Sequence, residues 1–362
     1  MIQSTTNCFP SVAEKSRGAR RAGGIFLLAV ALLLLSFGLN LTLGTISIPL
    51  EAVWASLTGS LESTNEVWYN IIWKSRLPQT LVSLFAGMGL SVSGLLMQTI
   101  FRNPLAGPSE LGISSGASLG VASVILISGS ISSRAMSRMG FVGEMAITLS
   151  AIVGAMAVMA LILVLSQRVK SNVVLLIMGV MIGYIATAII GVLKFFSNDE
   201  DVRSYVIWGL GSFSKVSGEQ VWVFVGLLTA VLPLSFLLMK PLNIMLLGDN
   251  YARSLGLNVK RARLAVIGCS CVLTALVTAY CGPIVFLGLA VPHLCRTLFS
   301  TANHKVLLPA TMLVGGLLSL CCNLVARMPG FEGALPINSV TALIGAPIVI
   351  SVILDRHRSE LT

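Results

Sequence analysis

The segment between residues 76 and 120 constrains this chain most, because two apolar stretches flank a short polar link. The link reads Arg102-Asn103-Pro104-Leu105-Ala106-Gly107-Pro108, and both flanking stretches are long enough for a membrane helix. The second stretch opens with Gly112, Gly116 and Gly120, whose spacing puts them on one helix face where another backbone can approach closely. The segment predicts tightly packed membrane helices and a structured reversal at one membrane surface.

Composition indicates an all-α, polytopic membrane protein. Hydrophobic residues make up 55% of the 362 residues and charged residues only 10%, whereas a soluble domain carries roughly a quarter charged residues. The net charge of +10 comes from basic residues in short loops between apolar stretches. The positive-inside bias explains this pattern better than binding to nucleic acid, so we expect no nucleic-acid partner.

About ten apolar stretches have the length of a membrane helix. They are 25–43, 81–100, 111–128, 142–165, 173–195, 221–239, 264–280, 284–299, 306–326 and 337–354. With both termini in the cytoplasm, most of the 24 Lys and Arg residues fall on inner segments, as the positive-inside rule requires. We therefore expect a cytoplasmic tail at 1–24, a transmembrane domain at 25–355 and a second cytoplasmic tail at 356–362. Five helices per half would give the halves opposite orientations, which is the inverted repeat common in transporters.

The inner loop at 240–263 mixes basic and apolar residues at helical spacing. Ala252, Leu255 and Leu257 form an apolar edge beside Arg253. This pattern favours a short helix along the membrane surface. A plain basic connector is the alternative.

The chain lacks motifs for catalysis and for ATP hydrolysis. It has no GxxxxGK[ST] loop and no HExxH motif, and no carboxylate lies in the middle of a predicted span where it could relay protons. Cys269 and Cys271 would point about 200° apart on a helix, so the cysteines predict neither a metal site nor a disulfide framework. A pathway without its own energy source indicates an external motor or passive flow.

Five motifs resemble those of the FecCD family of ABC-importer permeases and occur in the same order. They are Arg76-Leu77-Pro78, Asn103-Pro104-Leu105-Ala106, Leu111-Gly112-Ile113-Ser114-Ser115-Gly116-Ala117, GPIVFLGLAVPH at 282–293, and LPINSVTALIGAP at 335–347. The resemblance implies a type II importer permease fold, in which a ten-helix subunit pairs with a second copy around a central pathway in the bacterial inner membrane. Two cytoplasmic ABC ATPase subunits, which bind ATP and Mg, would drive transport. A periplasmic or lipid-anchored binding protein would deliver a ferric siderophore, haem or cobalamin, and this chain would need no cofactor of its own.

The resemblance also implies roles for individual residues. The segment that couples to the ATPase would contain Gly248, Asp249, Ala252, Arg253, Leu255, Gly256 and Leu257. The cytoplasmic gate would contain Asn103, Leu105, Ser171 and Asn172, for which helix capping is the alternative role. Arg76 and Arg327 would meet acids of the binding protein, unless they only reach toward lipid head groups.

Four positions depart from the family pattern. They are Gln79 in place of an arginine, Asn323 in place of an acid, Ala334 in place of a glutamate, and Asn338 in place of a glycine. Two other classes of protein remain as alternatives: a stand-alone channel or facilitator, and a membrane-embedded enzyme. The absence of a polar catalytic cluster inside the spans disfavours the enzyme.

Overall fold

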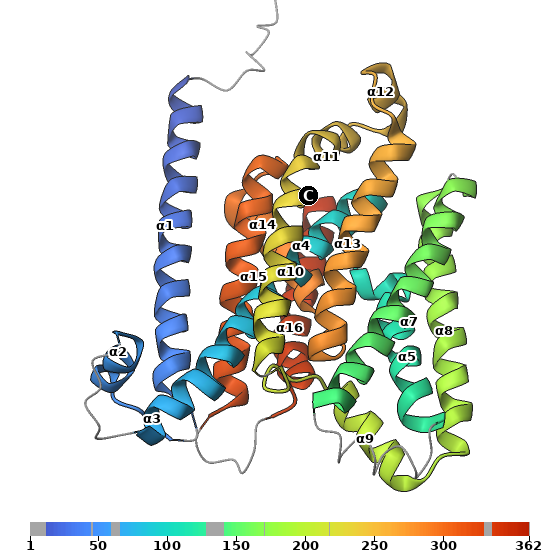
Figure 1. Ribbon diagram of the computed structural model, residues 1–362. Helices are drawn as coiled ribbons and strands as arrows, with labels where there is room; N and C mark the ends of the chain where they lie inside the picture. The colour runs from blue at the N-terminus through green and yellow to red at the C-terminus, as the bar shows by residue number, and fades with distance from the viewer. Residues whose placement is uncertain are drawn as a thin grey trace, which may run out of the picture.

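The computed structural model describes residues 12–44, 46–58, 66–127, 141–169, 171–216, 218–328 and 335–361. All regular secondary structure in these residues is helical, and none of them forms a strand (Figure 1). The helices are α1 (Val12–Thr42), α2 (Leu50–Thr58), α3 (Glu66–Ile71), the π-helical turn η1 (Ile72–Arg76), α4 (Leu77–Phe101), the 3₁₀ turn η2 (Pro108–Leu111), α5 (Ile113–Ile127), α7 (Phe141–Arg168), α8 (Asn172–Phe195), α9 (Asp199–Gly209), α10 (Glu219–Leu237), α11 (Met239–Leu246), α12 (Asp249–Ser254), α13 (Val259–Cys281), α14 (Leu287–Phe299), α15 (His304–Ala326) and α16 (Ile337–Leu361).

Ten of these helices coincide with the ten predicted spans. Seven are long and apolar enough to cross a membrane, and three shorter apolar helices, at Ile113–Ile127, Leu287–Phe299 and Ile337–Ser351, complete the set within the described residues. The helices at both ends extend into the predicted tails. Helix α1 begins at Val12, although its apolar part is Ala22–Thr42, and α16 continues to Leu361.

Helices α5 and α14 are short because a non-helical segment precedes each of them. After α4 the chain runs through residues 102–112 before α5 begins, and after α13 it runs through residues 282–286 before α14 begins. Helix α4 ends at the side of the bundle that carries α12, whereas α13 ends at the side that carries α9 (Figure 1). The same arrangement of long helix, irregular segment and short helix therefore occurs twice in opposite directions, as an inverted repeat requires.

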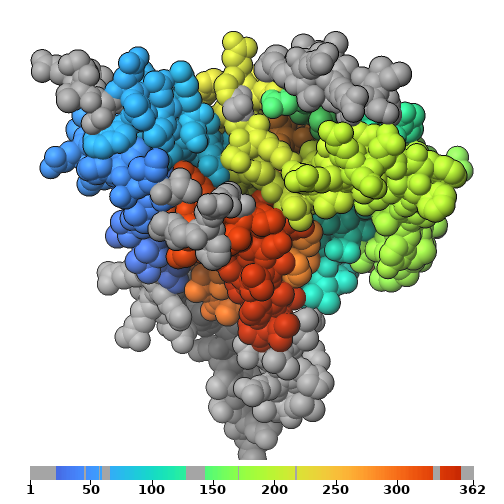
Figure 2. Space-filling model, turned by 90° about the horizontal axis from the view of Figure 1, so that it is seen from below, coloured from blue at the N-terminus to red at the C-terminus, as the bar shows by residue number. Residues whose placement is uncertain are grey.

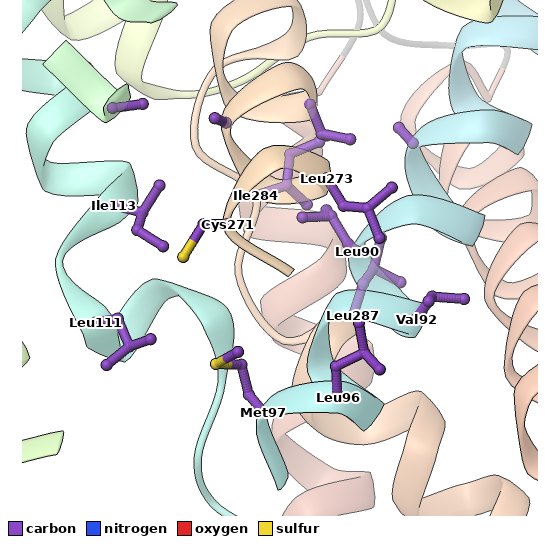
Figure 3. Close-up of a cluster of buried hydrophobic side chains, with 14 of the residues drawn as sticks. Leu90, Val92, Leu96, Met97, Leu111, Ile113, Cys271, Leu273, Ile284 and Leu287 are labelled. Carbon is purple, nitrogen blue, oxygen red and sulfur yellow. The ribbon is translucent and has the colours of Figure 1, made fainter. Parts of the chain in front are cut away.

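Helix α4 occupies the centre of the bundle, where it packs against α10, α13, α14 and α15. In the most apolar stretch of the α4 span 78% of the residues are buried, compared with 17% in α1. Figure 3 shows this core, in which Leu90 and Leu96 of α4 lie near Leu287, and Leu111 and Ile113 approach from the start of α5. The periphery is apolar as well, which suits helices that face lipid.

Backbone contact between α5 and α7 depends on glycine. A Cβ atom on Gly116 would lie 2.7 Å from the Gly154 carbonyl oxygen, and one on Gly120 would lie 2.0 Å from that of Ser150. Gly112, which we expected on the same helix face, instead precedes α5 with φ of 76° and packs against Gly179 of α8. Its role is therefore to turn the chain into α5, because a positive φ is strained for other residues.

Candidate functional site

The predicted coupling residues gather in and around α12, at one end of the molecule (Figure 1). Gly248 and Gly256 bound the helix with φ of 112° and 80°, and nothing lies within 4 Å of a Cβ atom at either position. Ala252 is fully buried, whereas Tyr251 and Leu255 are exposed. The segment therefore holds to the bundle on one face and presents apolar and basic groups on the other.

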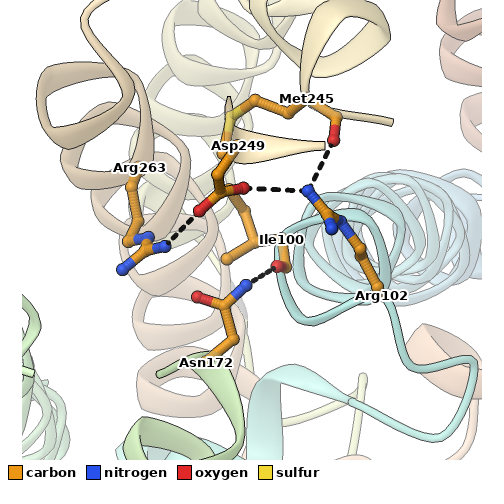
Figure 4. Close-up of polar contacts among 6 residues, drawn as sticks. All are labelled: Ile100, Arg102, Asn172, Met245, Asp249 and Arg263. Atoms are coloured by element: carbon orange, nitrogen blue, oxygen red, sulfur yellow. Dashed lines mark hydrogen bonds and ion pairs between the residues drawn. The ribbon is translucent and has the colours of Figure 1, made fainter. Parts of the chain in front are cut away.

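Asp249 connects α12 to two other helices (Figure 4). Its Oδ1 accepts a hydrogen bond from Arg102 Nη2 at 2.8 Å, and its Oδ2 accepts one from Arg263 Nη2 of α13 at 3.0 Å. Arg102, which ends α4 in a left-handed conformation with φ of 48°, also donates to the Met245 carbonyl oxygen at 3.0 Å. The carboxylate thus ties the start of α12 to the end of α4 and to the start of α13.

The four predicted gate residues lie at this same end and are held in different ways. Asn103 Oδ1 accepts from the Leu105 backbone N–H at 2.9 Å, and Leu105 is exposed. Ser171 caps α8 by accepting from the Val174 backbone N–H, whereas Asn172 Nδ2 donates to the Ile100 carbonyl oxygen of α4 at 2.6 Å. Ser171 therefore fills the capping role that we kept as the alternative, Asn103 stabilises a local turn of the chain, and Asn172 joins α8 to α4. Gating by these residues stays a prediction.

A buried polar network beside the coupling segment was not apparent from the sequence. His304, which is 1% exposed, is hydrogen-bonded through Nε2 to Thr99 Oγ1 at 2.9 Å and through Nδ1 to Asn243 Oδ1 at 2.8 Å. Arg296 Nη1 donates to Gln98 Oε1 at 2.5 Å. These contacts join α11 to α15, α15 to α4 and α4 to α14. The residues lie far apart in the sequence, so no spacing pattern could have indicated them.

Arg76 lies at the opposite end (Figure 1), where backbone carbonyl groups hold its guanidinium group. The residue ends the π-helical turn and is only 2% exposed. Its side chain donates to the carbonyl oxygens of Leu41 and Thr42, each at 2.7 Å, and to that of Ile46. The last carbonyl groups of a helix have no partner within it, so Arg76 stabilises the end of α1. Docking by Arg76 stays a prediction, and it requires the side chain to leave these carbonyls.

Arg327 lies beside Arg76, and its guanidinium group is not fully hydrogen-bonded. It follows α15, is half-buried, and its buried Nη1 has no hydrogen-bond partner within the described residues. A Cβ atom on Gly44 would lie 3.1 Å from Arg327 Nη2 and 3.2 Å from Arg76 Nη2. Burial, together with the charge of Arg76, lowers the pKa of Arg327 to about 10. Two guanidinium groups around one glycine form a site that favours an anionic group.

Two of the departures from the family pattern contact each other. Gln79 Nε2 donates to Asn323 Oδ1 at 3.0 Å, and Asn323 Nδ2 donates to Asn40 Oδ1 at 2.8 Å. Asn40 in turn donates to the Leu320 carbonyl oxygen at 3.1 Å. This amide ladder of Gln79, Asn323 and Asn40 joins α4, α15 and α1 without charge. An amide pair therefore stands where the family pattern has an arginine and an acid.

A third departure, Asn338, holds the irregular segment before α14. Its Oδ1 accepts from the Val285 backbone N–H at 3.1 Å, and its own N–H donates to the Leu210 carbonyl oxygen at 3.3 Å. The following residue of the segment, Phe286, has φ of 72°. Ala334, the fourth departure, lies outside the described residues. Within the described part of the chain, no three His, Cys, Asp or Glu residues are arranged to hold a metal ion.

The helices and their irregular segments define the class of the protein as a multi-pass membrane protein. The chain belongs to the FecCD transport family, whose model matches residues 32–355. It is 35% identical to the vitamin B12 import system permease protein BtuC of Klebsiella pneumoniae, over 94% of this chain and 95% of that protein. It is 34% identical to the hemin transport system permease protein HmuU of Yersinia pestis, over 92% of this chain and 95% of that protein.

A solved structure resembles the whole bundle. It is an inward-facing conformation of a metal-chelate type ABC transporter, with a TM-score of 0.79 and 30% sequence identity. The match covers 92% of this chain and 99% of the other. The predicted fold class and the family resemblance are both confirmed by these comparisons.

Proposed function

We propose that this chain is the membrane-spanning subunit of a bacterial ABC importer that moves an intact metal chelate or a corrinoid into the cytoplasm. Relatives of this chain include permeases for vitamin B12 and for hemin, so the cargo class is bulky and contains a bound metal. A ferric siderophore, haem or cobalamin fits this class. Two copies of the chain would form the pathway, and the metal would cross as part of the cargo.

The observation that carries the proposal is the junction at Asp249. The proposed ATPase contact is α12, so that end of the bundle and both termini would lie in the cytoplasm. Motion of α12 would reach the end of α4 through Arg102 and the start of α13 through Arg263. Because Arg102 directly precedes the proposed gate residues Asn103 and Leu105, a shift of α12 would move the gate.

The other end would receive the binding protein. Arg327 would meet a carboxylate there, and its unsatisfied Nη1 would gain a partner. Arg76 would add a second guanidinium group only by leaving the carbonyl groups to which it donates. Separate ATPase subunits would bind ATP and Mg, so this chain would need no cofactor.

Reconstitution tests the proposal. The permease is placed in liposomes with its ATPase and its binding protein, and uptake is measured with a chelate labelled on both metal and ligand. We expect ATP-dependent entry of both labels at a fixed ratio. Entry of the metal alone would overturn the intact-chelate mechanism. Entry that needs neither ATP nor the ATPase would favour the stand-alone facilitator, and chemical conversion of the chelate would favour the enzyme.

A further inference from the structure

Glu110 is a carboxylate inside the membrane domain, where the sequence had led us to expect none. It belongs to η2, and its carbonyl oxygen would lie 3.2 Å from a Cβ atom on Gly179. Gly179 is seven residues into α8, which begins at Asn172. With a rise of about 1.5 Å per residue, Glu110 lies about 10 Å inside the α12 end of that helix.

The two irregular segments meet at Glu110. A small cavity there is lined by Ser109 and Glu110 from the first segment and by Val285, Phe286 and Gly288 from the second segment and the start of α14. Leu90, near the middle of α4, lines it as well. Non-helical backbone at membrane depth is tolerated only where it is buried in protein or lines a water-filled space.

The Glu110 side chain has no described ionic partner. Among the described residues none donates a hydrogen bond to its carboxylate or forms an ion pair with it. Charged residues on the elements packed around it lie toward the helix ends, as Lys194 does at the far end of α8. Arg296 of α14 donates instead to Gln98.

The side chain is nevertheless only partly buried. Placing a charged carboxylate in the hydrocarbon of a membrane costs about 2.5–3.5 kcal/mol on insertion scales. The exposed side of Glu110 therefore faces water rather than lipid. Helix α5, which follows Glu110, and α16 lie toward the same face of the molecule (lower side of Figure 2), and a second copy would enclose an aqueous path on that face.

We propose that Glu110 puts a negative charge on the wall of the cargo pathway, so that the transporter favours neutral and cationic chelates over anionic ones. The inference rests on the proposed function for its cargo, but the charged aqueous wall can be tested without any cargo. A wall charge changes the local concentration of ions, and thus their encounter rates, by about tenfold or more.

The first experiment measures the charge directly. Ser109→Cys introduces a nearly isosteric thiol into the same cavity, in the full complex with its ATPase in liposomes. The thiol is labelled with a cationic and an anionic methanethiosulfonate, each rate being divided by that of a free thiol in solution. We expect the cationic reagent to react about tenfold faster, and Glu110→Gln to abolish the difference. The unsubstituted complex measures labelling of the native cysteines.

Three results would overturn the proposal: equal rates with Glu110 present, a rate difference that persists in Glu110→Gln, or no labelling of Ser109→Cys by either reagent. Glu200→Gln, an exposed carboxylate on α9, is the matched control and should leave both rates unchanged.

The second experiment measures selectivity. Ferric trihydroxamates that share one ligand skeleton and end in a carboxylate, an acetamide or an amine are compared in ATP-driven uptake, normalised to occupancy of the binding protein. Glu110→Gln should raise uptake of the anionic chelate relative to the neutral one by severalfold, and Glu110→Asp should not. If Glu110→Gln leaves the ratio of anionic to neutral chelate uptake unchanged, Glu110 does not select against anionic chelates. If no chelate enters the unsubstituted transporter, the proposed function fails for this cargo, whereas the labelling experiment still decides the wall charge.

Discussion

Arg102 Nη2 and Asp249 Oδ1 lie 2.8 Å apart and join the end of α4 to the first residue of α12. A second guanidinium, that of Arg263, holds the other oxygen of the same carboxylate. The Arg102–Asp249 pair is partly exposed, and exposed pairs stabilise a fold by only about 0–1 kcal/mol each. Arg263 is buried, and a buried ion pair adds little net stability because its charges must be removed from water. Their value is therefore more mechanical than energetic, because they connect a loop that would meet the ATPase to the helix that would carry the gate.

Asp249→Asn should uncouple ATP hydrolysis from uptake. The amide cannot hold two guanidinium groups, so α12 should move without moving α4. We expect uptake per ATP hydrolysed to fall about tenfold, while the amount of assembled complex is unchanged. Asp199→Asn, on the exposed start of α9, is the matched control. Normal uptake by Asp249→Asn would show that the junction does not transmit motion.

Arg253→Glu should weaken the contact with the ATPase without affecting insertion of the permease. The side chain is exposed on α12 and makes no described ion pair, so reversing its charge leaves the bundle intact. ATPase activity stimulated by loaded binding protein should fall, and lowering the salt concentration should enlarge the effect. Stimulation equal to that of the unsubstituted complex would count against a coupling role.

Arg327→Ala should weaken docking of the binding protein, and the affinity of the unsubstituted complex should fall with salt. Because its pKa is lowered only to about 10, Arg327 stays charged through pH 9 and docking should hold there. As the pH rises through about 10 the cation loses its proton, and docking should weaken. Arg203→Ala on α9 is the control. If the affinity for the binding protein changes neither with salt nor with Arg327→Ala, the binding protein docks on another surface.

Arg76→Ala should lower the stability of the folded permease, in addition to any effect on docking of the binding protein. The substitution leaves the carbonyl group of Leu41 without its described donor, at a cost of about 1–3 kcal/mol for a buried group left unsatisfied. The carbonyl group of Thr42 keeps the hydrogen bond that it accepts from the Ile48 backbone N–H at 3.0 Å. The temperature at which the detergent-solubilised permease aggregates should fall for Arg76→Ala and change little for Arg327→Ala. Equal effects of the two substitutions would contradict this division of roles.

Gly120→Ala should prevent α5 from packing against α7, because its Cβ atom would meet the Ser150 carbonyl oxygen at 2.0 Å. The yield of folded permease and its aggregation temperature should both fall. Gly191→Ala is the matched control, since nothing lies within 4 Å of a Cβ atom there. Two variants of equal stability would show that the close approach of α5 to α7 contributes nothing.

The number of helices and the family were predictable from the sequence, because span length and a series of ordered motifs are both local signals. Side-chain partners were not. Arg76 sits in a motif that we associated with the surface, yet the π-helical turn directs it into the bundle. His304 and Asn243, which are hydrogen-bonded, are separated by 61 residues, and no periodicity links them.

The depth of Glu110 in the membrane domain was also not predictable from the apolar spans. Glu110 lies between the predicted link at 102–108, which we expected at the membrane surface, and the predicted span that begins at residue 111. The structure carries that link about 10 Å inward, because α5 begins only at Ile113. A hydropathy window assigns each residue to a helix or a loop, and it cannot distinguish a loop at the surface from one that enters the membrane.

The amide ladder of Gln79, Asn323 and Asn40 has a practical consequence for the guanidinium groups near it. Its hydrogen bonds carry no net charge, so dissolved ions have little effect on how α1, α4 and α15 are held together. Ions do screen Arg327 and its attraction for a carboxylate. In this protein a salt titration can therefore report on the encounter with the binding protein, while the helices that support the encounter stay in place.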